Sequence, residues 1–304
     1  MDKKTSLIVI VGPTASGKTG LALRLAKKFN GEIISADSRQ VYKDLDIGTA
    51  KLKGIWKKKT YVAQNISHFC IDFISPKKTF TAADFKICAQ EAIAGIRGRN
   101  KIPIVAGGTG FWIDALLHDL DLPHVPPNEQ LRKKLEKKTP AELLRMLAKI
   151  DPRRAATIEQ KNPRRLMRAI EIAQAIGHTP PIAKRNPYRA LWLGISPNKD
   201  MLSRLIATRS RAMIRAGLVA ETKKLQAIGV SKKRIREFGF EYATALDVIE
   251  KKIPQNLFPE ILTRKTITYA KRQMRWFKPN RAIRWISNAR EAESRVTRFL
   301  KADL

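Results

Sequence analysis

The sequence of 304 residues has little cysteine and no long apolar run. Its two cysteines, Cys70 and Cys88, are too few for a disulfide framework or a cysteine-rich zinc module, and we expect both as reduced thiols. No apolar run approaches the roughly 20 residues that span a bilayer. The N-terminus leads straight into an apolar strand pattern, with no room for a signal peptide. These absences predict a cytoplasmic protein that does not enter a membrane.

Acidic residues are also scarce. The chain has 27 Asp and Glu against 60 Lys and Arg, which gives a formal net charge of +33. A positive field of this size favours a polyanion such as nucleic acid and accelerates its capture. A general basic bias or an adaptation to unusual ionic conditions would give the same composition. The charge therefore favours nucleic acid as a partner without establishing it.

Short apolar strands alternate with amphipathic helices over the first 116 residues, which predicts an α/β fold with a parallel sheet flanked by helices. We expect strands at 7–11, 32–35 and 102–106, and a helix at 82–96. A proline-rich stretch then leads into leucine-rich helical patterns, including one at 162–176 that Gly177 ends. A strand pattern returns at 191–195. We therefore expect a helical insertion at 121–190 within a core formed by 1–120 and 191–304, whose C-terminal part is mostly helical.

A complete phosphate-loop pattern follows the first predicted strand. It consists of Gly12, Pro13, Thr14, Ala15, Ser16, Gly17, Lys18 and Thr19. Such a loop cradles phosphate oxygens with backbone N–H groups at a helix N-terminus. Lys18 would add a charge to the outer phosphate, and the Thr19 hydroxyl would bind Mg²⁺. The pattern predicts a phosphate site in a P-loop core but leaves open whose phosphates it holds.

Polar and glycine-rich stretches follow two further predicted strands. One is Asp37 to Gln40, and the other is Gly107 to Gly110. In parallel sheets ligands bind at the carboxyl ends of the strands, so these stretches and the phosphate loop should form one site. Asp37 can act there either as a general base or as a ligand of Mg²⁺.

The combination of these motifs resembles the tRNA dimethylallyltransferase (tRNA isopentenyltransferase) family. It includes GPTASGKT at 12–19, ISADSRQVYKDLDIGTAK at 34–51, TAADF at 81–85 and GGTGFWIDALL at 107–117. NPRRLMRAIE at 162–171 and KRQ at 271–273 extend the resemblance over nearly the whole chain. It implies transfer of a dimethylallyl group from dimethylallyl diphosphate to N6 of the adenosine just 3′ of the anticodon, in tRNAs that read codons beginning with U. No cysteine follows Cys88, so the chain lacks the zinc finger of eukaryotic members and resembles the bacterial type.

The resemblance also implies roles for single residues. Asp37 matches the general base, and Lys18, Thr19 with Mg²⁺, and Arg209 match the groups that hold the diphosphate. Positions that match tRNA contacts are Asp37, Ser38, Arg39, Gln40, Thr109, Arg164, Arg165 and Arg168, with Lys271, Arg272 and Arg275 among the aromatic residues of 268–278. Thr109 can instead be a helix N-cap, and the basic residues can instead be solvated charges on helices. Glu241 departs from the family, which usually has a basic residue there.

Three other functions use parts of the same pattern. A small-molecule or nucleotide kinase would place ATP on the phosphate loop. A free-adenylate isopentenyltransferase shares the core motifs but has no need of the insertion or of such a high charge. An RNA-binding protein without activity has no use for Lys18 and Asp37 together. We expect a monomer whose partners are dimethylallyl diphosphate and the anticodon stem-loop of tRNA.

Overall fold

The computed structural model describes residues 4–181 and 183–302. Within them the chain forms two compact units, residues 1–119 with 185–304 and residues 120–184, which are described separately. The first unit is an α/β core and the second is helical. None of the helices in the described part has both the length and the apolar character needed to cross a membrane.

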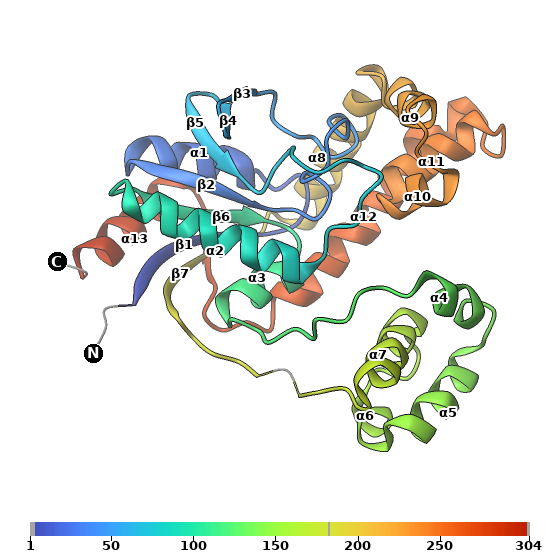
Figure 1. The fold of residues 1–304 in the computed structure, drawn as a ribbon. Coiled ribbons are helices and arrows are strands. Elements are labelled where there is room, and N and C mark those ends of the chain that lie inside the picture. Colours follow the sequence, from blue (N-terminus) through green and yellow to red (C-terminus); the bar gives the residue numbers. More distant parts are fainter. Residues whose placement is uncertain (1–3, 182, 303–304) are drawn as a thin grey trace. The chain divides into compact units, whose positions relative to one another are not determined.

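The core unit contains an eight-stranded sheet among its described residues, in the order β3-β4-β5-β2-β6-β1-β7-β8 (Figure 1). The strands are β1 (Thr5–Val11), β2 (Gly31–Ala36), β3 (Ile55–Lys57), β4 (Thr60–Ala63), β5 (Ile66–Phe69), β6 (Ile102–Gly107), β7 (Tyr188–Ile195) and β8 (Arg284–Ile286). Neighbouring strands from β5 to β8 are parallel, whereas β3, β4 and β5 pair antiparallel. This is a mostly parallel P-loop sheet, as the sequence predicts.

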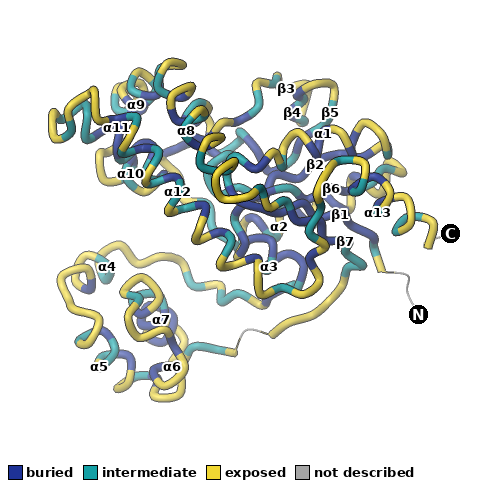
Figure 2. Tube along the Cα trace, turned by 180° about the vertical axis from the view of Figure 1, so that it is seen from behind, coloured by how far each residue is buried: buried dark blue, intermediate teal, exposed yellow. Residues whose placement is uncertain are grey.

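Helices cover both faces of this sheet. Leu7, Val9 and Val11 of β1 pack against α2 (Ala82–Gly98), α3 (Gly110–Leu117) and the C-terminal helices, whereas Ile8 and Ile10 pack against α1 (Lys18–Lys28) and α13 (Ala289–Lys301). The C-terminal helices are α8 (Lys199–Arg215), α9 (Leu218–Ala227), α10 (Lys232–Glu237), α11 (Phe240–Ile249), the short η1 (Gln255–Leu257) and α12 (Phe258–Phe277). Figure 2 shows the central strands as the most deeply buried part of this unit.

The helical unit packs four helices around a small leucine-rich core within its described residues. They are α4 (Glu129–Leu135), α5 (Pro140–Ile150), α6 (Pro152–Thr157) and α7 (Pro163–Ile176). The N-cap side chain of each helix accepts a hydrogen bond from its first turn, which satisfies one backbone N–H there. Glu171 is buried and pairs with Arg132 at 2.6 Å and Arg168 at 3.2 Å.

The expected strands at 7–11, 32–35, 102–106 and 191–195 are all present, and so are the helices at 82–96 and 162–176. The expectation of free thiols is wrong. Cys70, directly after β5, and Cys88 on α2 form a disulfide, with a Cα–Cα distance of 6.3 Å that lies in the usual range. The fold brings together two cysteines that are 18 residues apart in the sequence, and their number alone does not indicate this contact.

Candidate active site

The phosphate loop connects β1 to α1. Its two glycines are required by the backbone, because Gly12 and Gly17 have φ values of 151° and 91°. A Cβ on Gly12 would also lie 2.5 Å from the carbonyl oxygen of Ile195 on β7. The loop therefore lies directly against the sheet, and its backbone leads into the N-terminus of α1, where N–H groups are free to bind an anion.

A pocket of about 300 Å³ lies over this loop at the carboxyl ends of β2 and β6. It brings together all the residues expected to hold the diphosphate from Thr14 to Thr19, together with Asp37, Arg39, Gln40 and Arg209. The rest of its lining is Thr49, Ala50, Leu52, Ala106, Gly107, Gly108, Tyr269 and Gln273. Five parts of the chain that are far apart in sequence thus meet in one site.

Opposing interactions act on the charged form of Lys18 in this pocket. Its Nζ donates a hydrogen bond to the carbonyl oxygen of Pro13 at 2.6 Å. Burial and, to a lesser extent, the guanidinium of Arg209 lower the pKa of Lys18 from 10.5 to about 7, against a smaller opposite effect of the Asp37 carboxylate. Burial also lowers the pKa of Arg209. Both cations therefore lie in surroundings that an incoming anion would stabilise.

Ser16 also indicates that an oxygen-containing ligand binds at the phosphate loop. Its side-chain Oγ is buried, and among the described residues it has no hydrogen-bond partner. A buried hydroxyl without a partner costs free energy unless a ligand or water satisfies it. Since Ser16 belongs to the phosphate loop, a phosphate oxygen is the natural partner.

Asp37 lies at the end of β2 beside the glycine-rich loop. Its Oδ1 accepts a hydrogen bond from the backbone N–H of Arg39 at 3.0 Å. The Ser38 N–H donates to Oγ1 of Thr109 at 3.1 Å, and the Thr109 N–H donates to the carbonyl oxygen of Ala36 at 3.2 Å. Thr109 occupies the N-cap position of α3, but its side chain makes no capping hydrogen bond there. It instead fixes the turn that carries Asp37.

Arg39 is held on three sides. It forms an ion pair with Glu241, and its guanidinium lies 5.7 Å from the ring centre of Phe240 and 5.3 Å from that of Tyr269. Burial is the largest single influence and opposes its charge, but Glu241, Tyr269 and Asp37 together outweigh burial and raise the pKa of Arg39 above its ordinary value. The acidic residue that departs from the family pattern is thus a buried partner of Arg39.

The basic residues expected to contact tRNA do not line this pocket. Lys271, Arg272 and Arg275 are exposed on α12. Arg164, Arg165 and Arg168 belong to the helical unit. Arg165 pairs with Glu159 at 3.0 Å, and Arg168 also donates to the carbonyl oxygen of Val125 at 2.8 Å.

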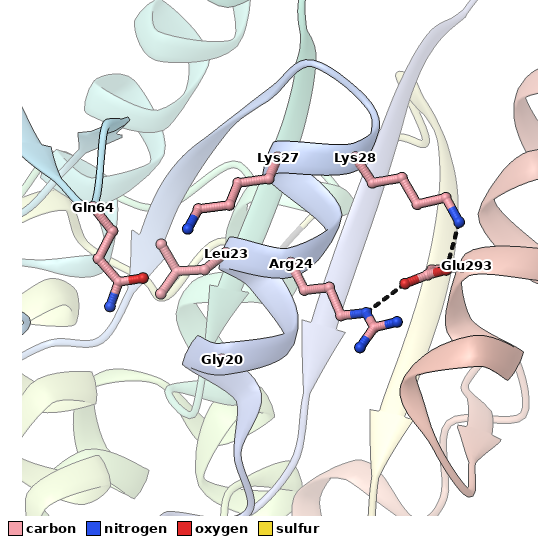
Figure 3. A pocket seen from close by; sticks show the side chains of 7 residues that line it. All are labelled: Gly20, Leu23, Arg24, Lys27, Lys28, Gln64 and Glu293. Carbon is pink, nitrogen blue, oxygen red and sulfur yellow. Dashed lines mark hydrogen bonds and ion pairs between the residues drawn. The ribbon is translucent and has the colours of Figure 1, made fainter.

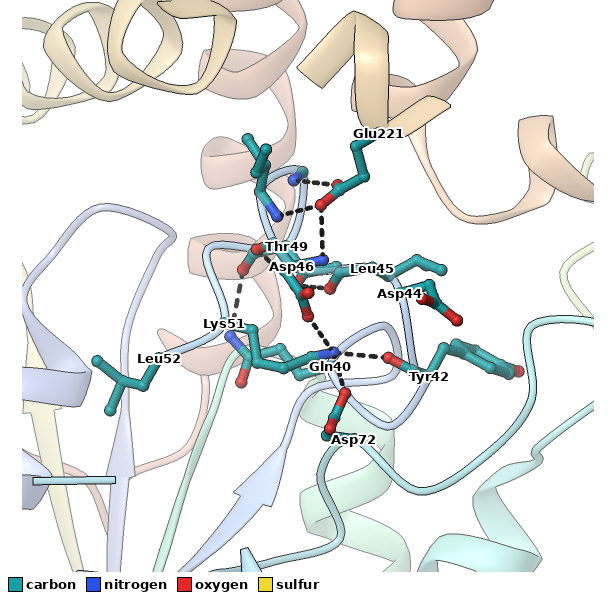
Figure 4. Close-up of polar contacts among 12 residues, drawn as sticks. Gln40, Tyr42, Asp44, Leu45, Asp46, Thr49, Lys51, Leu52, Asp72 and Glu221 are labelled. Atoms are coloured by element: carbon teal, nitrogen blue, oxygen red, sulfur yellow. Dashed lines mark hydrogen bonds and ion pairs between the residues drawn. The ribbon is translucent and has the colours of Figure 1, made fainter. Parts of the chain in front are cut away.

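The segment between Gln40 and Leu52 contributes more to the site than the motifs indicate (Figure 4). The buried Lys51 donates to the carbonyl oxygen of Tyr42 and pairs with Asp46 and Asp72, all at 2.6–2.7 Å. Glu221 on α9 accepts hydrogen bonds from the backbone N–H groups of residues 46, 47 and 48. These contacts fix the wall formed by Thr49, Ala50 and Leu52. The motif at 34–51 includes most of this segment, but its role as a wall of the pocket is evident only from the fold.

A larger hollow of about 630 Å³ lies along α1 (Figure 3). Arg24 and Lys28 on its rim are both paired with Glu293 of α13, and the hollow is open to solvent. Its lining includes no residue of the phosphate loop, and it does not include the carboxyl ends of the central strands. The pocket over the phosphate loop is therefore the better candidate for chemistry.

Family models and curated relatives match most of this chain. The family model described as IPP transferase matches residues 40–280, and that described as isopentenyl transferase matches residues 5–58. A tRNA dimethylallyltransferase of Acetivibrio thermocellus is 38% identical over 97% of this chain and 96% of its own length. One from Exiguobacterium is 38% identical over 95% of this chain and 93% of its own length.

Two solved structures are also similar to this chain. The tRNA isopentenylpyrophosphate transferase of Bacillus halodurans has a TM-score of 0.72 and 32% identity, over 99% of this chain and 98% of its own. A eukaryotic dimethylallyltransferase acting on tRNA has a TM-score of 0.70 and 25% identity, over 90% of this chain and 69% of its own. The likeness to the bacterial relatives therefore extends over nearly the full length of both chains.

Proposed function

Since the chain belongs to the tRNA dimethylallyltransferase family, we propose that it transfers a dimethylallyl group from dimethylallyl diphosphate to N6 of an adenosine in tRNA. The adenosine is the one on the 3′ side of the anticodon in tRNAs that read codons beginning with U. The observation that carries the proposal is the single pocket in which a phosphate loop faces Asp37.

The transfer breaks the bond between the allylic carbon and the diphosphate oxygen, whose electron pair leaves with the diphosphate. Loop N–H groups, Lys18 and Arg209 line the pocket where this charge would develop. A bond then forms between the allylic carbon and N6, and Asp37 accepts the proton that N6 loses. Each preorganised donor to such a leaving group is worth about 3 kcal/mol in the transition state.

We propose that the Thr19 hydroxyl of the phosphate loop would hold a Mg²⁺ ion. Mg²⁺ commonly keeps several waters and binds through one or two protein oxygens together with substrate phosphates. The described residues contain no group of three or more His, Cys, Asp or Glu side chains placed to hold a metal. A single protein hydroxyl fits an ion that would bind together with the diphosphate. When bound, the ion would neutralise part of the leaving-group charge.

The acceptor nucleotide must leave the stacked anticodon loop to reach N6, at a cost of a few kcal/mol. Contacts to the RNA backbone would offset this cost. We assign them to Lys271, Arg272 and Arg275 on α12 and to Arg164, Arg165 and Arg168 of the helical unit. Ser38, Arg39, Gln40 and Thr109 adjoin Asp37 or its turn and would contact the nucleotide itself.

We further propose that the active form is a monomer. We expect the activity in the cytoplasm, where tRNA is modified.

The test is to incubate the protein with labelled dimethylallyl diphosphate and either unmodified tRNA or AMP. We expect label in tRNA and none in AMP, with no consumption of ATP. Label in AMP alone would indicate a free-adenylate isopentenyltransferase. ATP consumption without prenyl transfer would indicate a kinase.

A further inference from the structure

One side chain connects the two glycine-containing loops of the pocket. Gln273 of α12 is buried, with 7% of its surface exposed. Its Oε1 accepts a hydrogen bond from the backbone N–H of Thr14 at 2.8 Å, and its Nε2 donates to the carbonyl oxygen of Gly108 at 3.0 Å. Thr14 belongs to the phosphate loop after β1, and Gly108 belongs to the loop after β6. The amide thus bridges both strand ends.

The side chains of α12 pack closely against the backbone of the glycine-rich loop. A Cβ on Gly108 would lie 2.2 Å from Nε2 of Gln273, and a Cβ on Gly110 would lie 2.2 Å from the ring of Trp276. Trp276, three residues further along α12, donates from Nε1 to Asp114 of α3 at 2.9 Å. Tyr269, four residues before Gln273, lies over Arg39. Residues at this spacing share one face of a helix, so a single face of α12 is fixed to the site.

The bridge requires both halves of a carboxamide. A glutamine offers one oxygen acceptor and two N–H donors on the same planar group, whereas a carboxylate offers acceptors only and a methionine offers neither. Here the acceptor faces a backbone N–H and the donor faces a backbone carbonyl. Replacing either half leaves at least one of these two backbone groups without its partner, which is unfavourable.

We propose that Gln273 is a positioning residue that holds the phosphate loop in register with the loop at 107–110 before the diphosphate binds. The inference rests on the proposed function, because it takes the phosphate loop as the diphosphate site. Donors that are aligned in advance need no rearrangement when charge develops on the leaving group. A misplacement of about 1 Å can cost 10²-fold in rate. In this role Gln273 acts on the substrate through the loop.

The first test compares Gln273→Met with the wild type, and Gln255→Met serves as the matched control on an exposed glutamine of the same unit. We expect Gln273→Met to weaken binding of inorganic diphosphate about 10-fold and to lower kcat/KM for dimethylallyl diphosphate about 10²-fold. The affinity for tRNA should stay close to the control, and the thermal midpoint of unfolding should fall by only a few degrees. Unchanged diphosphate binding and kcat/KM would overturn the inference. A parallel loss of tRNA affinity would also overturn it, since that indicates general damage to the fold.

The second test uses Gln273→Glu and a pH profile. An ionised Glu retains the bond from Thr14 but loses the donor to Gly108, whereas a protonated Glu regains it. The ratio of variant to wild-type kcat/KM should therefore rise as the pH falls from 8 to 5.5. Lys18, Asp37, Arg39, Arg209 and Tyr269 line the same pocket in both proteins, and the ratio removes the part of the pH dependence that the two proteins share. A ratio independent of pH would contradict the role of the donor.

Inorganic diphosphate separates this inference from the proposed function. A wild type that binds diphosphate but prenylates no tRNA refutes the proposed function alone. A Gln273→Met protein that prenylates tRNA as well as the wild type refutes the positioning role alone.

Discussion

Diphosphate binding should depend on pH because the pKa of Lys18 is about 7. The ammonium form attracts the diphosphate, and the neutral amine does not. With this pKa, Lys18 is protonated in about half of the molecules at pH 7, about a tenth at pH 8 and about a hundredth at pH 9. Affinity should therefore fall about 10-fold per pH unit above pH 8. A lysine with the ordinary pKa would show almost no change in this range.

The measurement is a series of calorimetric titrations with inorganic diphosphate from pH 6.5 to 9. Because the ligand also titrates, the wild type is compared with Lys18→Arg, whose guanidinium stays charged throughout. We expect the ratio of wild-type to variant affinity to fall by about two orders of magnitude from pH 7 to pH 9. Proton uptake above pH 8 should appear as a dependence on the ionisation enthalpy of the buffer. A constant ratio would refute the reasoning.

The causes of the shift give the signs of two further variants. The guanidinium of Arg209 lowers the pKa of Lys18, so Arg209→Gln should move the midpoint to higher pH. The carboxylate of Asp37 raises that pKa, so Asp37→Asn should move the midpoint to lower pH. Shifts in the opposite directions would mean that the charges around Lys18 do not control its protonation.

Three other outcomes follow from the site. Asp37→Asn should lower the rate of transfer about 10²–10⁴-fold while inorganic diphosphate still binds, as measured by single-turnover kinetics and calorimetry; loss of Mg²⁺-dependent diphosphate binding would instead assign Asp37 to the metal. The affinity for tRNA, measured by filter binding, should fall steeply with salt, and Lys271→Gln should reduce the slope by about 1; an unchanged slope would remove Lys271 from the RNA surface. Glu241→Ala leaves Arg39 buried without its partner and should lower the free energy of unfolding in urea by about 3 kcal/mol; a change below about 1 kcal/mol would contradict the importance of this pair.

The central strands could be predicted because their burial is visible in the sequence. Residues 7–11 form a continuous apolar run, and all five side chains are fully buried in β1. Strands covered on both faces have this pattern. The short β3 and β8 lie at the two edges of the sheet, and the residues of β3 are all exposed. Edge strands are defined by pairing more than by apolar residues, so β3 and β8 have no clear apolar pattern from which they could be predicted.

Some parts of the site could likewise be predicted from the sequence, and others could not. The sequence places the phosphate loop, Asp37 and the loop at 107–110 together because all three follow parallel strands. Arg209 and Gln273 come from α8 and α12, which reach the pocket only through tertiary packing. Arg209 could be assigned by family resemblance alone, and the bridging role of Gln273 has no local signal at all. Helix packing depends on contacts between distant segments, which no spacing within one segment encodes.

The pairing of Arg39 with Glu241 distinguishes this arginine from the other cations of the pocket. Three cations line it, but Glu241 is within ion-pair distance of Arg39 only, and among the described residues neither Lys18 nor Arg209 forms an ion pair. The two cations of the pocket without a carboxylate partner are thus Lys18, which belongs to the phosphate loop, and Arg209. Arg39 is neutralised and fixed between Phe240 and Tyr269. A basic residue at position 241 would remove this restraint and add a fourth cation, so the acidic residue makes Arg39 a rigid part of the wall beside Asp37. Any contact of Arg39 with the acceptor nucleotide must then be made in this fixed orientation.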